Sequence, residues 1–298
     1  MGSPEFAVPV LRGLTANYSV VGVVTQPDRP AGRGNKLTAP PVKTAAEELC
    51  IPTIQPEKLK LPEAFEQLTA WKPDVIVVAA FGQILRQNVL DLPRFGCINV
   101  HASLLPRWRG ASPIQAAIAA GDPQTGVTIM KMDRGVDTGP LLAQQTIAIT
   151  PEDTALSLSG KLAAIGAKLL IDTLPDYLSS AVSPQPQPDE DATYAALIEK
   201  EAGRLDFTLR SVVLERRVRA YNPWPVAFFE WGEGILKVFS AHVENSQTSL
   251  PGSRQIINEF PAVSTSEGWL VLDEVQPSGK KVMSGKAFLS GARDWLTA

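Results

Sequence analysis

The segment from Cys97 to Gly110 reads CINVHASLLPRWRG, a short apolar strand followed by a turn-forming stretch. Asn99 and His101 are two positions apart, so their side chains point to the same face of the expected strand. Ligands of α/β sheets bind beyond the carboxyl ends of the strands, where this pair lies. The chain has only two histidines, which makes His101 a candidate for proton transfer near neutral pH. The alternative is that both side chains only satisfy backbone groups.

A second polar segment, Met130 to Leu142, reads MKMDRGVDTGPLL. Its aspartates and glycines fit a simple turn or a calcium loop, but no bidentate acid follows at the position that an EF-hand requires. We therefore expect a tight loop that brings the carboxylate of Asp133 or Asp137 to a strand end. With the amide and the imidazole this makes a catalytic set, in which the amide donates to an oxyanion, the imidazole transfers protons and the carboxylate sets the tautomer.

Apolar strands and amphipathic helical patterns alternate along the first part of the chain. This alternation is typical of a doubly wound, mostly parallel α/β sheet, here expected to be Rossmann-like. The expected strands are 19–25, 74–80, 97–102, 126–132 and 141–149, and the expected helices are 3–14, 42–50, 57–71, 112–120 and 154–178.

The remainder of the chain has a different pattern. Residues 182–191 (VSPQPQPDED) combine three prolines with acidic side chains, which is typical of an extended connector. An arginine-rich helical stretch over 204–220 and several short β-like runs follow, and this order predicts a small OB-like barrel, a form that often binds nucleic acids. We thus predict a catalytic domain over 1–181, a linker over 182–203 and a second domain over 204–298. The β-like runs are 226–230, 235–242, 253–258, 269–272 and 281–283.

Several motifs carry a resemblance to a known family. Residues 99–106 (NVHASLLP), 109–110 (RG) and 133–140 (DRGVDTGP) resemble the signature of folate-dependent formyltransferases. The resemblance covers nearly the whole chain and includes 222–225 (NPWP), which is similar to the branch of the family that formylates methionyl-tRNA. It implies 10-formyltetrahydrofolate as the formyl donor, the α-amine of initiator methionyl-tRNA as the acceptor, and no metal.

The resemblance also implies roles for individual residues. Asn99 and His101 would stabilise the oxyanion, and His101 would also transfer protons. Asp137, which precedes Thr-Gly-Pro, would orient His101, whereas Asp133 is the second choice and would shape the loop. The folate pocket is expected to be lined by two segments, the second of which serves equally well as ordinary packing. The first is Ser103, Leu104, Leu105 and Pro106, and the second is Phe81, Gly82 and Ile84.

The loop over 26–41 (QPDRPAGRGNKLTAPP) has four prolines, two glycines and an excess of basic residues. Its charge alone favours a solvated loop, but the resemblance implies that it reaches the acceptor end of the tRNA, where Lys and Arg bind phosphates. Arg107 and Arg109 could hold the glutamate tail of folate or a tRNA phosphate, or be solvated. The predicted tRNA contacts are Arg29, Arg33, Lys36 and Lys43 in the first domain and Arg204, Arg216, Lys280 and Lys281 in the second.

The start of the chain departs from the family pattern. The family opens with a short apolar strand, whereas here Met1 directly precedes Gly2-Ser3-Pro4. Such a strand lies inside the sheet, so its absence predicts a gap in the core and unpaired ladder groups. We therefore expect that the start is misplaced or that this chain is shortened.

Composition fits a globular protein of two domains, with 298 residues, 44% hydrophobic and 20% charged. The net charge of −3 excludes a global nucleic-acid-binding field, and residues 199–298 hold 12 basic and 12 acidic side chains, so any RNA contact must be a local stripe. Cys50 and Cys97 form no C-x-x-C pair, which predicts a reducing, cytoplasmic compartment. We find no transmembrane run and expect a monomer.

Four other functions compete with this interpretation. Enzymes that formylate amino-sugar nucleotides share the Asn-x-His…Asp core, but the basic loop and the pair Lys280-Lys281 favour tRNA. Hydrolysis of the formyl donor would leave the second domain unexplained. A dinucleotide-dependent oxidoreductase is disfavoured because no G-x-G-x-x-G follows a strand. A module that only binds RNA would not need Asn99, His101 and Asp137 together.

Overall fold

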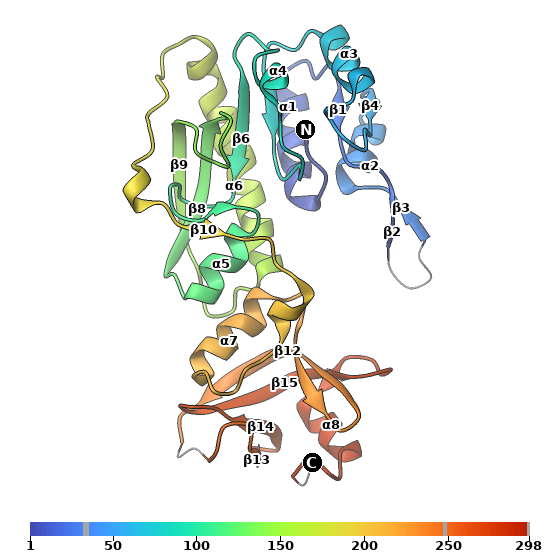
Figure 1. Ribbon diagram of the computed structural model, residues 1–298, viewed down its shortest axis with the longest axis vertical. Coiled ribbons are helices and arrows are strands. Elements are labelled where there is room, and N and C mark those ends of the chain that lie inside the picture. Colours follow the sequence, from blue (N-terminus) through green and yellow to red (C-terminus); the bar gives the residue numbers. More distant parts are fainter. Residues whose placement is uncertain (32–35, 247–248, 297–298) are drawn as a thin grey trace. The chain divides into compact units, whose positions relative to one another are not determined.

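The computed structural model describes residues 1–31, 36–246 and 249–296 (Figure 1). Its internal contacts divide the chain into two compact units. The first unit comprises residues 1–113, 124–148 and 159–195, and the second comprises 114–123, 149–158 and 196–298. None of the helices in these described residues is long and apolar enough to cross a membrane.

The first unit holds a four-stranded sheet and a separate parallel pair of strands. In the larger sheet the first two strands are parallel, whereas the third runs antiparallel to both of its neighbours. The larger sheet has the order β5 (Ile76–Val78), β6 (Cys97–His101), β8 (Gln124–Lys131) and β9 (Leu141–Ala148), and the pair is β1 (Val23–Val24) with β4 (Thr53–Ile54).

Helix α6 (Ala155–Leu178) packs against one face of the larger sheet through an apolar stripe that includes the buried Leu162 and Leu170. Gly166 permits this close approach, because a Cβ there would lie 2.9 Å from the Cγ1 of Val100. Since Val100 faces the helix, the alternate positions 99 and 101 of β6 face the opposite side. The unit also contains α1 (Val8–Asn17), α2 (Pro41–Glu48), α3 (Pro62–Trp71), α4 (Gln87–Leu90), η1 (Glu5–Ala7) and η2 (Asp189–Asp191).

Met1 and Gly2 connect β1 with β5. The Gly2 amide donates to the Val24 carbonyl, and the Ala79 amide donates to the Met1 carbonyl. Beyond Met1, a cavity of about 310 Å³ is lined by residues of both strands and by apolar side chains that include Leu174.

Two short ribbons complete the first unit. The loop after β1 forms an antiparallel hairpin of β2 (Arg29–Ala31) and β3 (Lys36–Thr38), which extends away from the rest of the unit in Figure 1. In the predicted linker, β10 (Tyr194–Ala195) pairs in parallel with β7 (Arg109–Gly110). The chain after α6 therefore runs beside the segment that follows β6.

The second unit is built on an antiparallel sheet. Its core contains the fully buried Leu214, Leu236, Leu270 and Trp295, so helices and sheet share one apolar centre. The sheet has the order β11 (Ala227–Trp231), β12 (Gly234–Glu244), β15 (Trp269–Pro277), β14 (Phe260–Ser264) and β13 (Arg254–Ile257), with β16 (Met283–Ser284) on β15, and the helices are α5 (Pro113–Ala120), α7 (Ser211–Ala220), α8 (Gly285–Gly291) and η3 (Lys200–Gly203).

The predicted class, an α/β domain followed by a small β domain, is confirmed. The helix predicted over 204–220 is shorter than expected and begins only at Ser211. The Asp206 carboxylate accepts hydrogen bonds from the amide and hydroxyl of Thr208, and this local turn competes with a helix. Strand β14 and helix α8 were not expected from the sequence pattern.

Candidate active site

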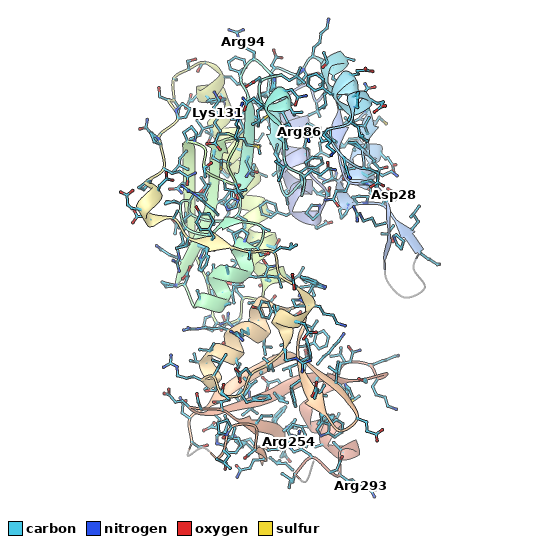
Figure 2. All side chains as sticks on the ribbon, in the orientation of Figure 1. Asp28, Arg86, Arg94, Lys131, Arg254 and Arg293 are labelled. Atoms are coloured by element: carbon cyan, nitrogen blue, oxygen red, sulfur yellow. The ribbon has the colours of Figure 1, made fainter. Side chains whose placement is uncertain are left out.

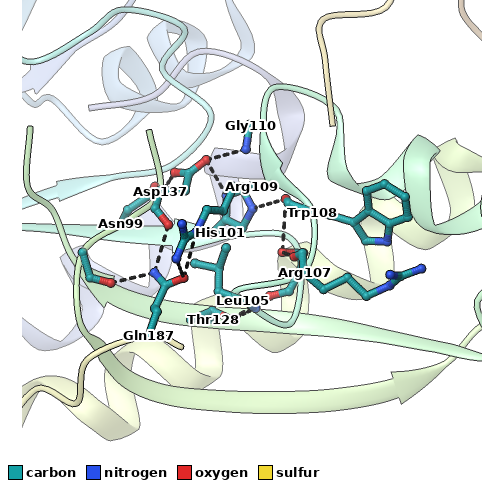
Figure 3. Close-up of polar contacts among 12 residues, drawn as sticks. Asn99, His101, Leu105, Arg107, Trp108, Arg109, Gly110, Thr128, Asp137 and Gln187 are labelled. Atoms are coloured by element: carbon teal, nitrogen blue, oxygen red, sulfur yellow. Dashed lines mark hydrogen bonds and ion pairs between the residues drawn. The ribbon is translucent and has the colours of Figure 1, made fainter. Parts of the chain in front are cut away.

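Asn99, His101 and Asp137 meet at the carboxyl end of β6 (Figure 3). The Asn99 side-chain amide donates to Oδ1 of Asp137 at 3.2 Å, and Nδ1 of His101 lies 3.6 Å from Oδ2 of Asp137. Asn99 and His101 are buried, with 8% and 6% of their surfaces exposed. The loop between β8 and β9 thus carries the carboxylate to the two strand residues that precede it by more than thirty positions.

The second nitrogen of the His101 ring fixes its tautomer. Nε2 lies 2.9 Å from the carbonyl oxygen of Trp108, and a carbonyl can only accept, so Nε2 carries a proton. Nδ1 then faces the Asp137 carboxylate. Each ring nitrogen therefore has an acceptor oxygen next to it, the Trp108 carbonyl at Nε2 and the Asp137 carboxylate at Nδ1.

The carboxylate of Asp137 has a further donor. The backbone amide of Gly110 donates to Oδ2 at 2.8 Å, and the Asp137 backbone has φ = 54°, in the left-handed region. Asp133, the second choice from the sequence, accepts instead from the amide of Gly135 and the hydroxyl of Thr138. Its carboxylate shapes the loop, whereas that of Asp137 contacts Asn99 and faces His101.

Thr128 and Gln144 hold the predicted folate segment in place. The buried Thr128 hydroxyl donates to the Ser103 carbonyl at 2.6 Å and accepts from the Leu105 amide at 3.1 Å. The Gln144 amide donates to the Leu105 carbonyl at 2.8 Å. Ser103 and Leu105 are buried, whereas Leu104 and Pro106 keep exposed surface. The latter two are thus better placed to line a ligand pocket.

The other predicted folate residues lie after β5. The Phe81 side chain is buried in the core of the first unit, and its carbonyl accepts from the Gln26 side-chain amide at 3.0 Å. Gly82 has φ = 76°, and a Cβ there would lie 2.6 Å from the Gln26 side chain. Ile84 is 82% exposed. Of this segment, only Gly82 and Ile84 present surface to a ligand.

The predicted tRNA contacts of the first unit lie on and near the hairpin. Arg29 on β2 and Lys36 on β3 are exposed. Lys43 forms an ion pair of 2.8 Å with Asp28, which is labelled in Figure 2. The side chains of Gln55 and Lys43 donate hydrogen bonds to the Asp28 carboxylate. These bonds, that of Gln55 most of all, hold the pKa of Asp28 below its ordinary value. Arg33 lies outside the described residues.

In the second unit, the predicted tRNA contacts have different surroundings. Arg204 pairs with Glu201 and Glu230, and the Arg216 guanidinium packs on Gly121, where a Cβ would lie 2.1 Å from Cζ. Lys280 and Lys281 are exposed beside β16. The four residues thus lie directly after η3, on α7 and in the turn before β16.

Arg109 is not solvated, and the expectation of a solvent-facing or phosphate-facing side chain is wrong. Its guanidinium is 2% exposed and donates to Gln187 and Asp189. Burial opposes its charge, but hydrogen bonds to Asp189 and Tyr194 outweigh burial and raise its pKa. Arg107 instead stacks on the Trp108 ring, with its Cζ atom 4.5 Å from the ring centroid.

Cys97 is not a nucleophile candidate. Its side chain is 1% exposed, and burial raises the pKa of its thiol to about 12, so it stays protonated. No cluster of three or more His, Cys, Asp or Glu side chains suited to a metal occurs among the residues that the structure describes. The side chains that meet at the carboxyl end of β6 are an amide, an imidazole and a carboxylate.

The chain resembles known formyl transferases in sequence and in structure. It matches the family described as Formyl transferase over residues 2–174 and the family described as Formyl transferase, C-terminal domain, over residues 197–293. Proteins named methionyl-tRNA formyltransferase from Myxococcus xanthus and Bacillus pumilus are 51% and 49% identical to it, each over 98% of this chain and 93% of the relative.

Two solved structures share its fold. An N-formyltransferase from Helicobacter canadensis in complex with folinic acid and dTDP-3-aminofucose has a TM-score of 0.67 at 18% identity, over 93% of this chain and 97% of that one. The methionyl-tRNA formyltransferase from Clostridium thermocellum has a TM-score of 0.54 at 18% identity, over 89% of this chain and 100% of that one. From these matches, the chain belongs to the formyl transferase family.

Proposed function

We propose that the protein transfers the formyl group of 10-formyltetrahydrofolate to the α-amine of initiator methionyl-tRNA, giving formylmethionyl-tRNA for translation initiation. The observation that carries the transferase chemistry is the contact of Asp137 with Asn99 and His101. The choice of acceptor is supported by six relatives, 43–51% identical over almost the whole chain, which are named methionyl-tRNA formyltransferase. We place this activity in the cytoplasm and expect a monomer.

The residues of the site fit direct transfer without a covalent enzyme intermediate. When bound, 10-formyltetrahydrofolate supplies the formyl carbon that the amine attacks. The Asn99 amide has two N–H groups and uses only one for Asp137, so the other is available to an oxyanion. His101 transfers protons, and Asp137 keeps its ring oriented. Loss of one oxyanion donor costs roughly 10²–10³ in rate.

The positions of the predicted binding residues support this assignment. Pro106 and Leu104 are held next to the catalytic set by the network around Thr128, which suits a rigid folate wall. Exposed Arg29 and Lys36 suit contacts with tRNA phosphates.

A second candidate is formylation of an amino-sugar nucleotide. This candidate is supported by the fold similarity to the Helicobacter canadensis enzyme, whose structure contains dTDP-3-aminofucose. The sequence identity of that pair is low, whereas identity to the methionyl-tRNA formyltransferases is about half of all residues. We therefore rank tRNA first.

One assay distinguishes the two functions. The protein is incubated with 10-formyltetrahydrofolate and either methionyl-tRNA or a dTDP-linked amino sugar, and formylated product is measured. We expect product from the tRNA only, and product from the sugar only would overturn the assignment. His101→Ala is expected to abolish most turnover, and full activity of this variant would refute the chemistry.

A further inference from the structure

We propose that Gln187 is a positioning residue for formyl transfer and that Arg109 holds it in place. The proposal rests on the proposed function. Gln187 lies in the predicted linker, yet its side chain reaches the loop that carries Asp137 (Figure 3). All of the residues involved belong to the first unit.

The Gln187 side-chain amide donates two hydrogen bonds to the main chain of the catalytic loop. Nε2 lies 2.9 Å from the carbonyl oxygen of Asp137 and 2.7 Å from that of Gly139. Asp137 has the left-handed φ of 54°, which a residue with a Cβ adopts only when its surroundings hold it. The two hydrogen bonds supply such a restraint on the residue whose carboxylate faces His101.

Arg109 fixes the orientation of the Gln187 amide. Nε and Nη2 of Arg109 lie 3.0 Å and 2.9 Å from Oε1 of Gln187, and Nη2 also donates to Asp189 at 2.8 Å. A guanidinium only donates, and the two carbonyls only accept, so the oxygen and nitrogen of the Gln187 amide cannot exchange places. The charge on the donor strengthens the contact.

Arg109 and Gly110, the two residues of β7, restrain Asp137 from two sides. The Gly110 amide holds the carboxylate, while Arg109, its neighbour, holds the main chain through Gln187. The linker is itself anchored, because Gln185 and Leu141 exchange two backbone hydrogen bonds of 2.7 Å and 2.8 Å. The position of Asp137 relative to His101 therefore depends on a residue outside both catalytic segments.

Gln187→Glu is the variant that separates the hydrogen bonds accepted from Arg109 from those donated to the carbonyls of Asp137 and Gly139. It keeps an acceptor for Arg109 but loses both N–H donors, and it places a carboxylate oxygen beside two carbonyls. We expect kcat to fall roughly 10–100-fold, since a misplacement of about 1 Å costs up to 10²-fold, while KM for each substrate stays within a small factor. Gln185→Ala is the matched control, because the side chain of Gln185 is exposed and, among the described residues, its one hydrogen bond is to the Ser183 carbonyl, so we expect wild-type kinetics.

A double-mutant cycle tests whether Gln187 acts through Asp137. In an Asp137→Asn background, Gln187→Glu is expected to cause little further loss, because both changes remove the same orientation of the carboxylate. A wild-type kcat in Gln187→Glu, or losses that multiply fully in the double variant, would overturn the proposal.

A measurement without substrate keeps this test independent of the proposed function. Amide hydrogen exchange in residues 137–141 should be faster in Gln187→Glu than in the wild type and in Gln185→Ala. Unchanged exchange would contradict the restraint. An inactive wild-type protein would refute the proposed function and leave the exchange result as the test of the restraint.

Discussion

Asp137 and Asp133 lie four residues apart in one loop, but their carboxylates have different partners. Asp137 accepts from Asn99 and Gly110 and faces His101, so each of its oxygens is committed to the site. Asp133 accepts from groups of its own loop and is exposed. The difference between the two residues can be measured.

We predict that Asp137→Asn lowers kcat by about 10²–10⁴-fold, the range of a lost contribution to proton transfer. Asn99 and Gly110 donate to different oxygens of Asp137, and an asparagine has an acceptor oxygen at only one of these two positions, so one donor would face an NH2 group. Asp133→Asn is the control and should lose much less, because a single side-chain oxygen can accept both of its hydrogen bonds. Steady-state kinetics of formylation check this, and equal losses in the two variants would contradict it.

Thr128 carries a second prediction at this scale. Its hydroxyl is fully buried and bonds the Ser103 carbonyl and the Leu105 amide. Thr128→Val keeps the shape but leaves buried groups unpaired, so we expect the free energy of unfolding to fall by about 1–3 kcal/mol. Thr128→Ser keeps the hydroxyl and should lose less in urea unfolding. If the two variants are equally stable, the hydroxyl does not hold the segment.

The sequence indicated the candidate catalytic residues but not the residues that hold them in place. Asn99 and His101 stand at an expected strand end and drew attention by residue type, whereas the resemblance to formyltransferases was needed to choose Asp137 over Asp133. Thr128 and Gln187 are ordinary polar residues in a strand and in a proline-rich segment. Their importance depends on partners that the sequence cannot place, since Gln187 and Arg109 are 78 positions apart.

At the scale of elements, strand β1 shows that an apolar sequence pattern does not reveal whether a segment has a neighbouring strand to pair with. The apolar run over 19–25 predicts a strand of seven residues, but only Val23 and Val24 are paired as one. A strand needs a hydrogen-bonding neighbour as well as apolar side chains, and residues 19–22 line the cavity instead. In the second unit, β14 was missed, but the strands that were expected there agree better, because each has a paired partner.

For a chain that begins at Met1 with a free amine, the buried ammonium group beside that cavity predicts a pH dependence of stability. The Met1 ammonium donates to the Val77 carbonyl at 2.6 Å, and burial lowers its pKa from 8.0 to about 6. Between pH 8 and pH 6 the unfolded chain therefore binds more protons than the folded one, so stability falls as the pH falls through this window. The shift corresponds to a loss of about 2–3 kcal/mol in the free energy of unfolding, complete near pH 6.

Urea unfolding between pH 6 and 8 checks this prediction on protein whose mass confirms that Met1 is retained with a free amine. Acetylation of the amine is the control, because it removes the titrating group and the cavity beside Met1 has room for an acetyl group. We expect the acetylated protein to lose that part of the pH dependence. The same dependence in both forms would contradict the assignment to Met1.

At the scale of the whole molecule, charge gives no global attraction to tRNA. The net charge is −3, and the predicted contacts are a minority of the 28 basic residues. Some of them are already paired, as Lys43 is with Asp28 and Arg204 with Glu201 and Glu230. Exposed residues such as Lys36 are therefore expected to contribute more to phosphate binding than paired ones.

We predict that Lys36→Ala weakens tRNA binding and reduces the slope of log K against log salt by about 0.7–0.9, the value for one phosphate contact. Lys43→Ala should change the slope less, because Asp28 already neutralises the ammonium group in the free protein and must be displaced by a phosphate. Lys60→Ala removes an exposed charge outside the predicted contacts and is the control. Binding of methionyl-tRNA measured across a series of salt concentrations provides the slopes. If Lys36→Ala and Lys60→Ala have the same slope, the hairpin contributes only general charge, and the prediction that it contacts tRNA fails.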